Sequence, residues 1–144
     1  MFDVIIISHG NYAQAMLESA EMIIGKQDHV KTMGIFPDDS VDIFRENLFQ
    51  AIKESLAGNG LLLLSDTKSG SPFNSAVAAM KELRFYHIAG INLPLLLEVF
   101  ANRKKKNPEE VRNILFELVP FTLIDVNKYF DELGVFSQSL GKSL

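Results

Sequence analysis

Short apolar segments alternate along the chain with longer segments whose apolar residues recur every three or four positions. The short segments have the length of strands and cover residues 2–8, 30–36, 61–65 and 86–91. The first has no polar residue between Asp3 and Ser8, which is typical of a strand buried on both faces. The longer segments predict amphipathic helices over residues 12–24, 41–56 and 72–84.

Proline residues mark where the later elements begin and end. Ser71-Pro72 has the form of a helix start, with the serine as N-cap and the proline at the first helical position. Pro94 and Pro108 open two further helices, which are expected over residues 95–101 and 108–118. Pro120 ends the second of these, and residues 121–126 are expected to form a last, short strand.

The order of strands and helices predicts an α/β fold with a doubly wound, mostly parallel sheet. Alternation of strand and helix requires crossover connections and places helices on both faces of the sheet. The simplest strand order is 2-1-3-4, in which the first and third strands are neighbours and the direction of winding reverses between them. Ligands of such sheets bind at this switch point, beyond the carboxyl ends of the strands. His9 ends the first strand and Asp66 ends the third, so we expect the two side chains to meet there.

Composition narrows the class of protein. The length of 144 residues fits one domain, which we expect over residues 1–130, followed by an extension over residues 131–144. A net charge of −4 argues against a nucleic-acid binder, and the longest apolar runs are too short to cross a bilayer. The chain has no cysteine and no signal-peptide pattern at its start, which fits a cytoplasmic protein.

A histidine, a carboxylate and two helix N-termini at one switch point suggest a phosphohistidine site. Imidazole can attack a phosphoryl donor through one nitrogen while a carboxylate, here Asp66, holds the other as N–H. Backbone N–H groups near helix starts suit the phosphoryl oxygens. We expect the contacts at Gly10, Thr67, Gly70 and the Ser71 hydroxyl. The chemistry needs no metal or cofactor if the donor is itself a phosphohistidine.

Plainer interpretations of the same residues remain open at this point. His9 fits a polar strand end, and Asp66 fits a turn or N-cap residue. His29 and His87 are expected at the opposite end of the sheet, in structural roles, and residues 103–106 in a solvated basic loop. Motifs of other enzymes are missing: no Gly-x-Gly-x-x-Gly follows the first strand, and no Gly-x-Ser-x-Gly elbow is present.

Three separated motifs resemble the IIA domain of the mannose-type (mannose/fructose/sorbose) sugar phosphotransferase system. The first is Ile-Ile-Ser-His-Gly at residues 6–10, followed by Ala-Glu-Met-Ile-Ile-Gly at residues 20–25. The second is Asp66-Thr67 with Gly-Ser-Pro-Phe-Asn-Ser-Ala at residues 70–76. The third is Ile-Ala-Gly-Ile-Asn-Leu-Pro-Leu-Leu-Leu-Glu at residues 88–98. The similarity covers roughly residues 1–130, in order and with the expected spacing.

The resemblance implies a phosphotransferase that acts as a phosphoryl carrier. Its phosphoacceptor would be His9, charged by the phosphocarrier protein HPr and discharged to a histidine of the matching IIB component during sugar import. Asp66 would be the partner of the imidazole, and Ser71 would border the phosphate site. The membrane components IIC and IID, which select the sugar, would be reached only indirectly.

The resemblance also implies a homodimer in which the final, antiparallel strand crosses to the other subunit's sheet. The short segment at residues 121–126 is consistent with that arrangement, since pairing across a dimer removes an exposed edge. Lys68 and Ser69 depart from the family pattern, which commonly has a bulky apolar residue and a glycine there. Two alternatives stay open: a phosphohistidine subunit of a dihydroxyacetone kinase, and a non-catalytic regulatory module that binds a ligand.

Overall fold

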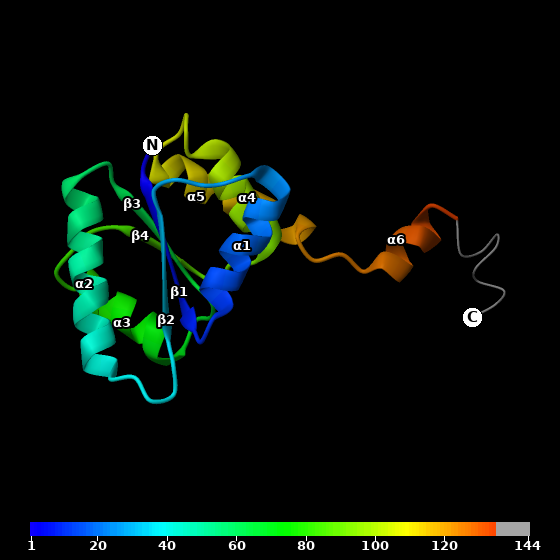
Figure 1. Cartoon of the computed structure of the whole chain (residues 1–144). Coiled ribbons are helices and arrows are strands. Elements are labelled where there is room, and N and C mark those ends of the chain that lie inside the picture. The colour runs from blue at the N-terminus through cyan, green and yellow to red at the C-terminus, as the bar shows by residue number, and fades with distance from the viewer. Residues whose placement is uncertain (135–144) are drawn as a thin grey trace.

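A parallel four-stranded sheet forms the centre of the molecule in the computed structural model, which describes residues 1–134 (Figure 1). Its strand order is β2-β1-β3-β4, as predicted. The four strands are β1 (Asp3–His9), β2 (Val30–Ile35), β3 (Leu61–Ser65) and β4 (Tyr86–Ala89). All three pairings are parallel, and β4 is two residues shorter than the segment predicted from the sequence.

Helices cover both faces of this sheet (Figure 1). One face packs against three of them: α1 (Tyr12–Ile24), α4 (Leu93–Asn102) and α5 (Pro108–Leu118). The other face packs against α2 (Val41–Ala57) and α3 (Gly70–Met80). Within residues 1–134, no helix is long and apolar enough to span a membrane.

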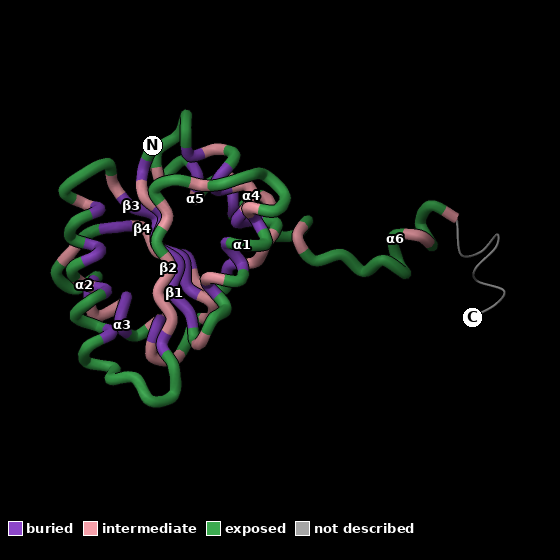
Figure 2. Tube along the Cα trace, viewed as in Figure 1, coloured by how far each residue is buried: buried purple, intermediate pink, exposed green. Residues whose placement is uncertain are grey.

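The core consists of two layers that share the central strands, drawn in purple in Figure 2. Successive residues of a strand point to opposite faces, so β1 contributes Val4 and Ile6 to one layer and Ile5 and Ile7 to the other. Each of these four side chains is at most 1% exposed. Full burial of one such side chain is worth about 1.5–3 kcal/mol, which explains why β1 is apolar without alternation.

The start of α3 differs from the sequence prediction. Ser69 is the N-cap and α3 begins at Gly70, two residues before the start expected from Ser71-Pro72. Pro72 is tolerated because the first turn of a helix has no intrahelical acceptor for its N–H groups.

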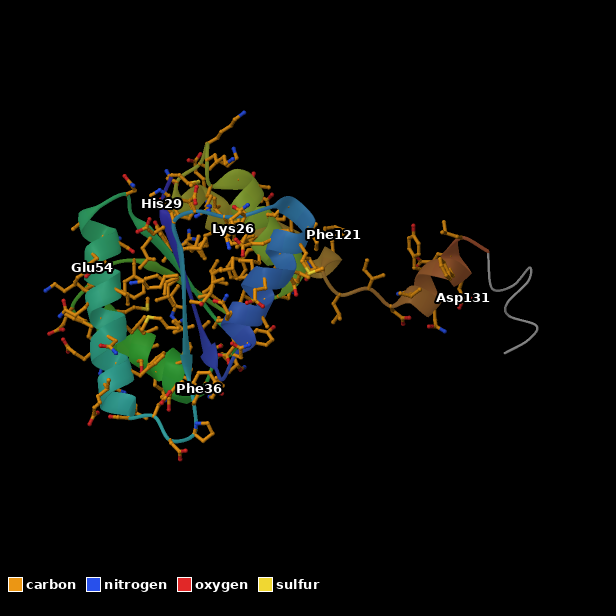
Figure 3. The ribbon with its side chains drawn as sticks, in the orientation of Figure 1. Lys26, His29, Phe36, Glu54, Phe121 and Asp131 are labelled. Atoms are coloured by element: carbon orange, nitrogen blue, oxygen red, sulfur yellow. The ribbon has the colours of Figure 1, made fainter. Side chains whose placement is uncertain are left out.

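The predicted last strand over residues 121–126 is not formed. A short 3-10 helix spans Val119–Phe121, residues 122–125 are irregular, and α6 covers Val126–Glu132. This segment leads away from the body of the molecule, and no strand within residues 1–134 pairs with its backbone groups (Figures 1 and 3). We call residues 121–134 the C-terminal arm. Of the extension expected over residues 131–144, residues 135–144 lie outside the described part of the chain.

Arg103 is buried, contrary to the solvated position expected for it, whereas Lys104, Lys105 and Lys106 are exposed as predicted. Its guanidinium donates hydrogen bonds to the backbone carbonyls of Asp28 and His29 and stacks on the Phe100 ring at 5.0 Å. The hydrogen bonds of its two terminal nitrogens offset much of the cost of taking the guanidinium out of water, whereas its buried Nε has no hydrogen-bond partner among residues 1–134. Arg103 thus fastens the turn before β2 to α4.

Candidate functional site

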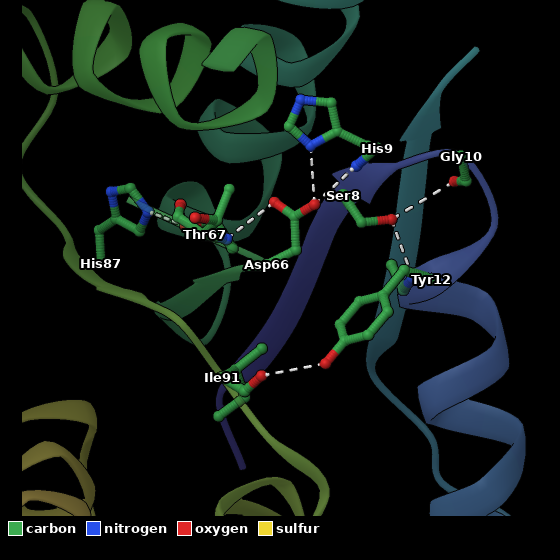
Figure 4. A network of polar contacts seen from close by, with 10 residues as sticks. Ser8, His9, Gly10, Tyr12, Asp66, Thr67, His87 and Ile91 are labelled. Carbon is green, nitrogen blue, oxygen red and sulfur yellow. Dashed lines mark hydrogen bonds and ion pairs between the residues drawn. The ribbon is translucent and has the colours of Figure 1, made fainter. Parts of the chain in front are cut away.

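The carboxyl ends of β1 and β3 bring His9 and Asp66 together, as the strand order predicts. The register pairs Ile7 with Ser65, and the Asp66 N–H continues the ladder with a 3.1 Å hydrogen bond to the Ile7 carbonyl. The last residue of β1, His9, and the first residue after β3, Asp66, therefore lie at the same edge of the sheet (Figure 4).

One carboxylate oxygen of Asp66 holds His9 at two points (Figure 4). Oδ2 accepts the His9 backbone N–H at 2.9 Å and lies 2.8 Å from the ring Nδ1. The other oxygen, Oδ1, accepts the Thr67 N–H at 2.9 Å, which fixes the carboxylate itself. This geometry favours a proton on Nδ1 and leaves the lone pair of Nε2 available as a nucleophile. The carboxylate is 13% exposed and the imidazole 54%, so the ring can be reached from outside while its partner is shielded.

The Nε2 side of the ring faces the start of α3. A Cβ atom built on Gly70 would lie 2.7 Å from both Nε2 and Cε1 of His9, so only glycine allows the backbone this close to the ring. Gly70 also has a φ of +90°, a conformation that other residues rarely adopt. The Ser69 side chain does not cap this helix, so the N–H groups of its first turn are left without that partner.

The four residues expected to bind the phosphoryl oxygens are not equally free to donate a hydrogen bond to them. The Gly10 N–H is donated to the Ile35 carbonyl at 2.7 Å, and the Thr67 N–H is donated to Asp66. Neither backbone group is therefore free for a phosphoryl oxygen in this structure. Gly70 and Ser71 lie in the first turn of α3, on the Nε2 side of the ring.

His87 contacts Ser65, the last residue of β3 before Asp66, although the sequence analysis expected His87 at the far end of the sheet. Its Nε2 is 2.8 Å from the Ser65 hydroxyl, and that oxygen is 3.4 Å from the Thr67 carbonyl (Figure 4). Burial lowers the pKa of His87 to about 4, so the ring is neutral near pH 7. The register between β3 and β4 would have indicated this contact. Leu63 pairs with His87, so the Ser65 side chain, two residues further along β3, lies on the same face of the sheet as the His87 side chain. His29 is at the opposite end of β1, as expected, with its Nδ1 3.1 Å from Asp3 Oδ1.

A family model described as the fructose IIA component of the phosphotransferase system matches residues 3–116, well over half of the chain. The chain belongs to the mannose-type IIA family of the sugar phosphotransferase system. Members of this family are phosphotransferases, and the chain is a phosphoryl carrier of such a system. The match supports this role over the dihydroxyacetone kinase subunit and the ligand-binding module.

Individual members of the IIA family are similar over most of the chain. The fructose-specific EIIA component of Bacillus subtilis is 33% identical over 116 residues, which are 80% of each chain. The mannose-specific EIIAB component of Escherichia coli is 33% identical over 101 residues, which are 69% of this chain and 31% of that longer protein. The crystal structure of a IIA protein associated with the fucose utilization operon of Streptococcus pneumoniae superposes with a TM-score of 0.75 at 29% identity. That alignment covers 90% of this chain and 97% of the other.

Proposed function

We propose that His9 carries the phosphoryl group, which it accepts from phospho-HPr and passes to a histidine of a IIB component. The observation that supports this assignment most directly is the 2.8 Å contact between His9 Nδ1 and Asp66 Oδ2. It orients the half-exposed imidazole and leaves Nε2 as the nucleophile. We take residues 1–130 as the carrier domain and the cytoplasm as its compartment.

Transfer at this site is a direct exchange between two nitrogen atoms. The lone pair of His9 Nε2 forms a bond to phosphorus while the bond between phosphorus and the donor histidine nitrogen breaks, and the donor nitrogen keeps that electron pair. The His9 ring then bears a proton on Nδ1 and the phosphoryl group on Nε2, and is positively charged. Asp66 balances this charge through the same hydrogen bond that fixed the ring beforehand. Discharge to IIB is the same exchange in the opposite direction.

The start of α3 is the part of the site that would hold the phosphoryl oxygens. Its first turn lies beside Nε2 through Gly70, and the positive end of its dipole points at the site. The Ser71 hydroxyl adds a donor from the same turn. Gly10 and Thr67 contribute through the shape of their loops, because their N–H groups are already bonded.

We also propose that the C-terminal arm completes the sheet of a second copy of the chain. Large apolar side chains of the arm are exposed: Phe121, Leu123, Ile124, Val126, Tyr129 and Leu133. The outer edge of β4 is unpaired within the described chain, since β4 pairs only with β3. If the arm of one copy formed an antiparallel strand on the β4 edge of the other, it would bury its own apolar side chains and pair the open edge of β4.

A reconstituted relay tests the proposed function. The chain is charged with phosphoenolpyruvate, enzyme I and HPr, separated from them, and mixed with the IIB domain of a mannose-type system. We expect the phosphoryl group to move from the chain to IIB. We expect Asp66→Ala to reduce the rate at which phospho-HPr charges the chain by about 10²-fold, because the His9 ring loses its orientation. An Asp66→Ala protein that charges as fast as the wild type would contradict the assignment of Asp66.

A further inference from the structure

Lys68 stands out by its charge among the residues at the carboxyl edge of the sheet. In the described chain, the segments that follow the four strands cover residues 10–11, 36–40, 66–69 and 90–92. Their charged side chains are Asp38, Asp39, Asp66 and Lys68, so Lys68 is the single cation in these segments. A phosphoryl group that carries close to two negative charges therefore meets a mostly acidic edge.

The position of Lys68 is fixed by contacts on both sides of it. Two residues before it, Asp66 bonds the His9 ring at Nδ1; two residues after it, Gly70 approaches the same ring at Nε2. Two peptide steps place the Lys68 Cα within about 7.6 Å of the Cα of either neighbour. The four-carbon stem of lysine can carry its ammonium group across most of such a distance. The loop that bears Lys68 thus approaches the reacting ring at both of its nitrogen atoms.

The ammonium group of Lys68 has no competing partner. The side chain is exposed, and no hydrogen bond or ion pair involves it among residues 1–134. A free, flexible ammonium group with three donors can turn toward an anion without first breaking a contact.

We infer that Lys68 is a phosphoryl-binding residue, whose Nζ contacts the phosphoryl oxygens on Nε2 of phosphorylated His9. The inference rests on the proposed function, because it needs a phosphoryl group at His9. Lys68 adds a mobile positive charge to the fixed dipole of α3 and offsets the carboxylates of the neighbouring loops. It therefore stabilises the charged carrier and the transferring group, without taking part in bond formation.

Three variants separate this role from a general effect of charge. Lys68→Gln removes the cation, Lys68→Arg keeps it, and Lys81→Gln makes the same change of net charge at the far end of α3. That end is about 16 Å from Gly70, more than a Debye length at physiological ionic strength. Both lysines are exposed, so we expect all three variants to fold, and circular dichroism checks this.

Two readouts are needed, one with the donor protein and one without any partner. We expect Lys68→Gln to be charged by phospho-HPr about three- to tenfold more slowly than the wild type, and the other two variants to stay within twofold. In the isolated phosphorylated protein, we expect phosphorus NMR to show a higher pKa for the phosphoryl group in Lys68→Gln alone, because its dianion loses a nearby cation.

An unchanged phosphoryl titration in Lys68→Gln would overturn the inference. If charging were slower with an unchanged titration, Lys68 would instead be a contact for the donor protein. A wild-type chain that phospho-HPr cannot charge would overturn the proposed function itself, an outcome distinct from any difference between the variants.

Discussion

At the scale of single residues, the site depends on how closely residues 66–70, between β3 and the start of α3, approach the two nitrogen atoms of the His9 ring. Asp66 fixes one nitrogen of the ring by a 2.8 Å contact, and the backbone at Gly70 lies against the other. Ser65, at the end of β3, contacts both His87 and the Thr67 carbonyl of this loop. Together these contacts hold the His9 ring so that only Nε2 is available to a phosphoryl donor.

Gly70→Ala is predicted to impair the site by displacing the His9 ring. The added Cβ would lie 2.7 Å from Nε2, and alanine would be strained at a φ of +90°. We expect a loss of about 1–2 kcal/mol in the free energy of unfolding and a charging rate reduced by more than tenfold. Gly60→Ala is the matched control, because Gly60 has a similar φ of +93° but its added Cβ would meet nothing closer than 3.9 Å. Equal charging rates for the two variants would contradict the close approach at Gly70.

His87 is predicted to make stability depend on pH. Burial lowers its pKa from 6.5 to about 4, so between these values the unfolded chain binds a proton that the folded chain does not. The free energy of unfolding therefore falls as the pH falls through this window, by about 3 kcal/mol from this group between pH 7 and pH 4. Urea unfolding at pH 7 and at pH 4 measures this decrease in the free energy of unfolding. In His87→Gln the decrease should be smaller by about 3 kcal/mol. An identical fall in the two proteins would show that His87 is not buried in neutral form.

At the scale of elements, the apolar runs predicted the strands, and their alternation with helices predicted the parallel sheet and its order. The meeting of His9 and Asp66 followed from that order alone. Details set by single contacts could not be predicted in the same way. Arg103 is buried because carbonyls at residues 28 and 29, distant in sequence, accept its N–H groups, and a basic run gives no sign of them. Likewise, the Ser71-Pro72 pair gave no sign that α3 begins two residues earlier, at Gly70, where the backbone lies against the His9 ring.

Two serines at helix starts are predicted to differ in their effect on stability. The Ser40 side chain accepts the Ile43 N–H at the start of α2, whereas the Ser69 side chain makes no such bond at the start of α3. Ser40→Ala should lower the free energy of unfolding by about 1 kcal/mol, and Ser69→Ala should change it by less than half of that. Chemical denaturation of both variants measures the difference. A larger loss in Ser69→Ala would mean that its hydroxyl caps α3, and that the first turn is less available to a phosphoryl group.

At the scale of the whole molecule, the described chain is a compact α/β body with an arm that leads away from it (Figures 1 and 3). The body buries its apolar core within the sheet and the helices around it, whereas Leu123 in the arm is 89% exposed. Residues 121–126 have the composition of a strand but pair with no strand among residues 1–134. The sequence could predict the tendency to form a strand, but pairing depends on which edge the arm meets.

The proposed dimer is predicted to depend on the apolar side chains of the arm. Leu123→Asp should convert a dimer into a monomer, because a carboxylate cannot be buried against a second sheet without a partner. Ile43→Asp on α2 is the matched control, since Ile43 is 63% exposed on the body and lies outside the arm. Light scattering coupled to size-exclusion chromatography distinguishes the two states. A wild-type chain that is monomeric at micromolar concentration would contradict the proposal.

The most direct test of the central claim is the intact mass of the chain before and after incubation with phosphoenolpyruvate, enzyme I and HPr. The wild type is predicted to gain one acid-labile phosphoryl group, and His9→Gln none, whereas His29→Gln, altered at the opposite end of the sheet, gains it as the wild type does. A phosphoryl group on folded His9→Gln, or none on the wild type beside charged HPr, would show that His9 is not the carrier.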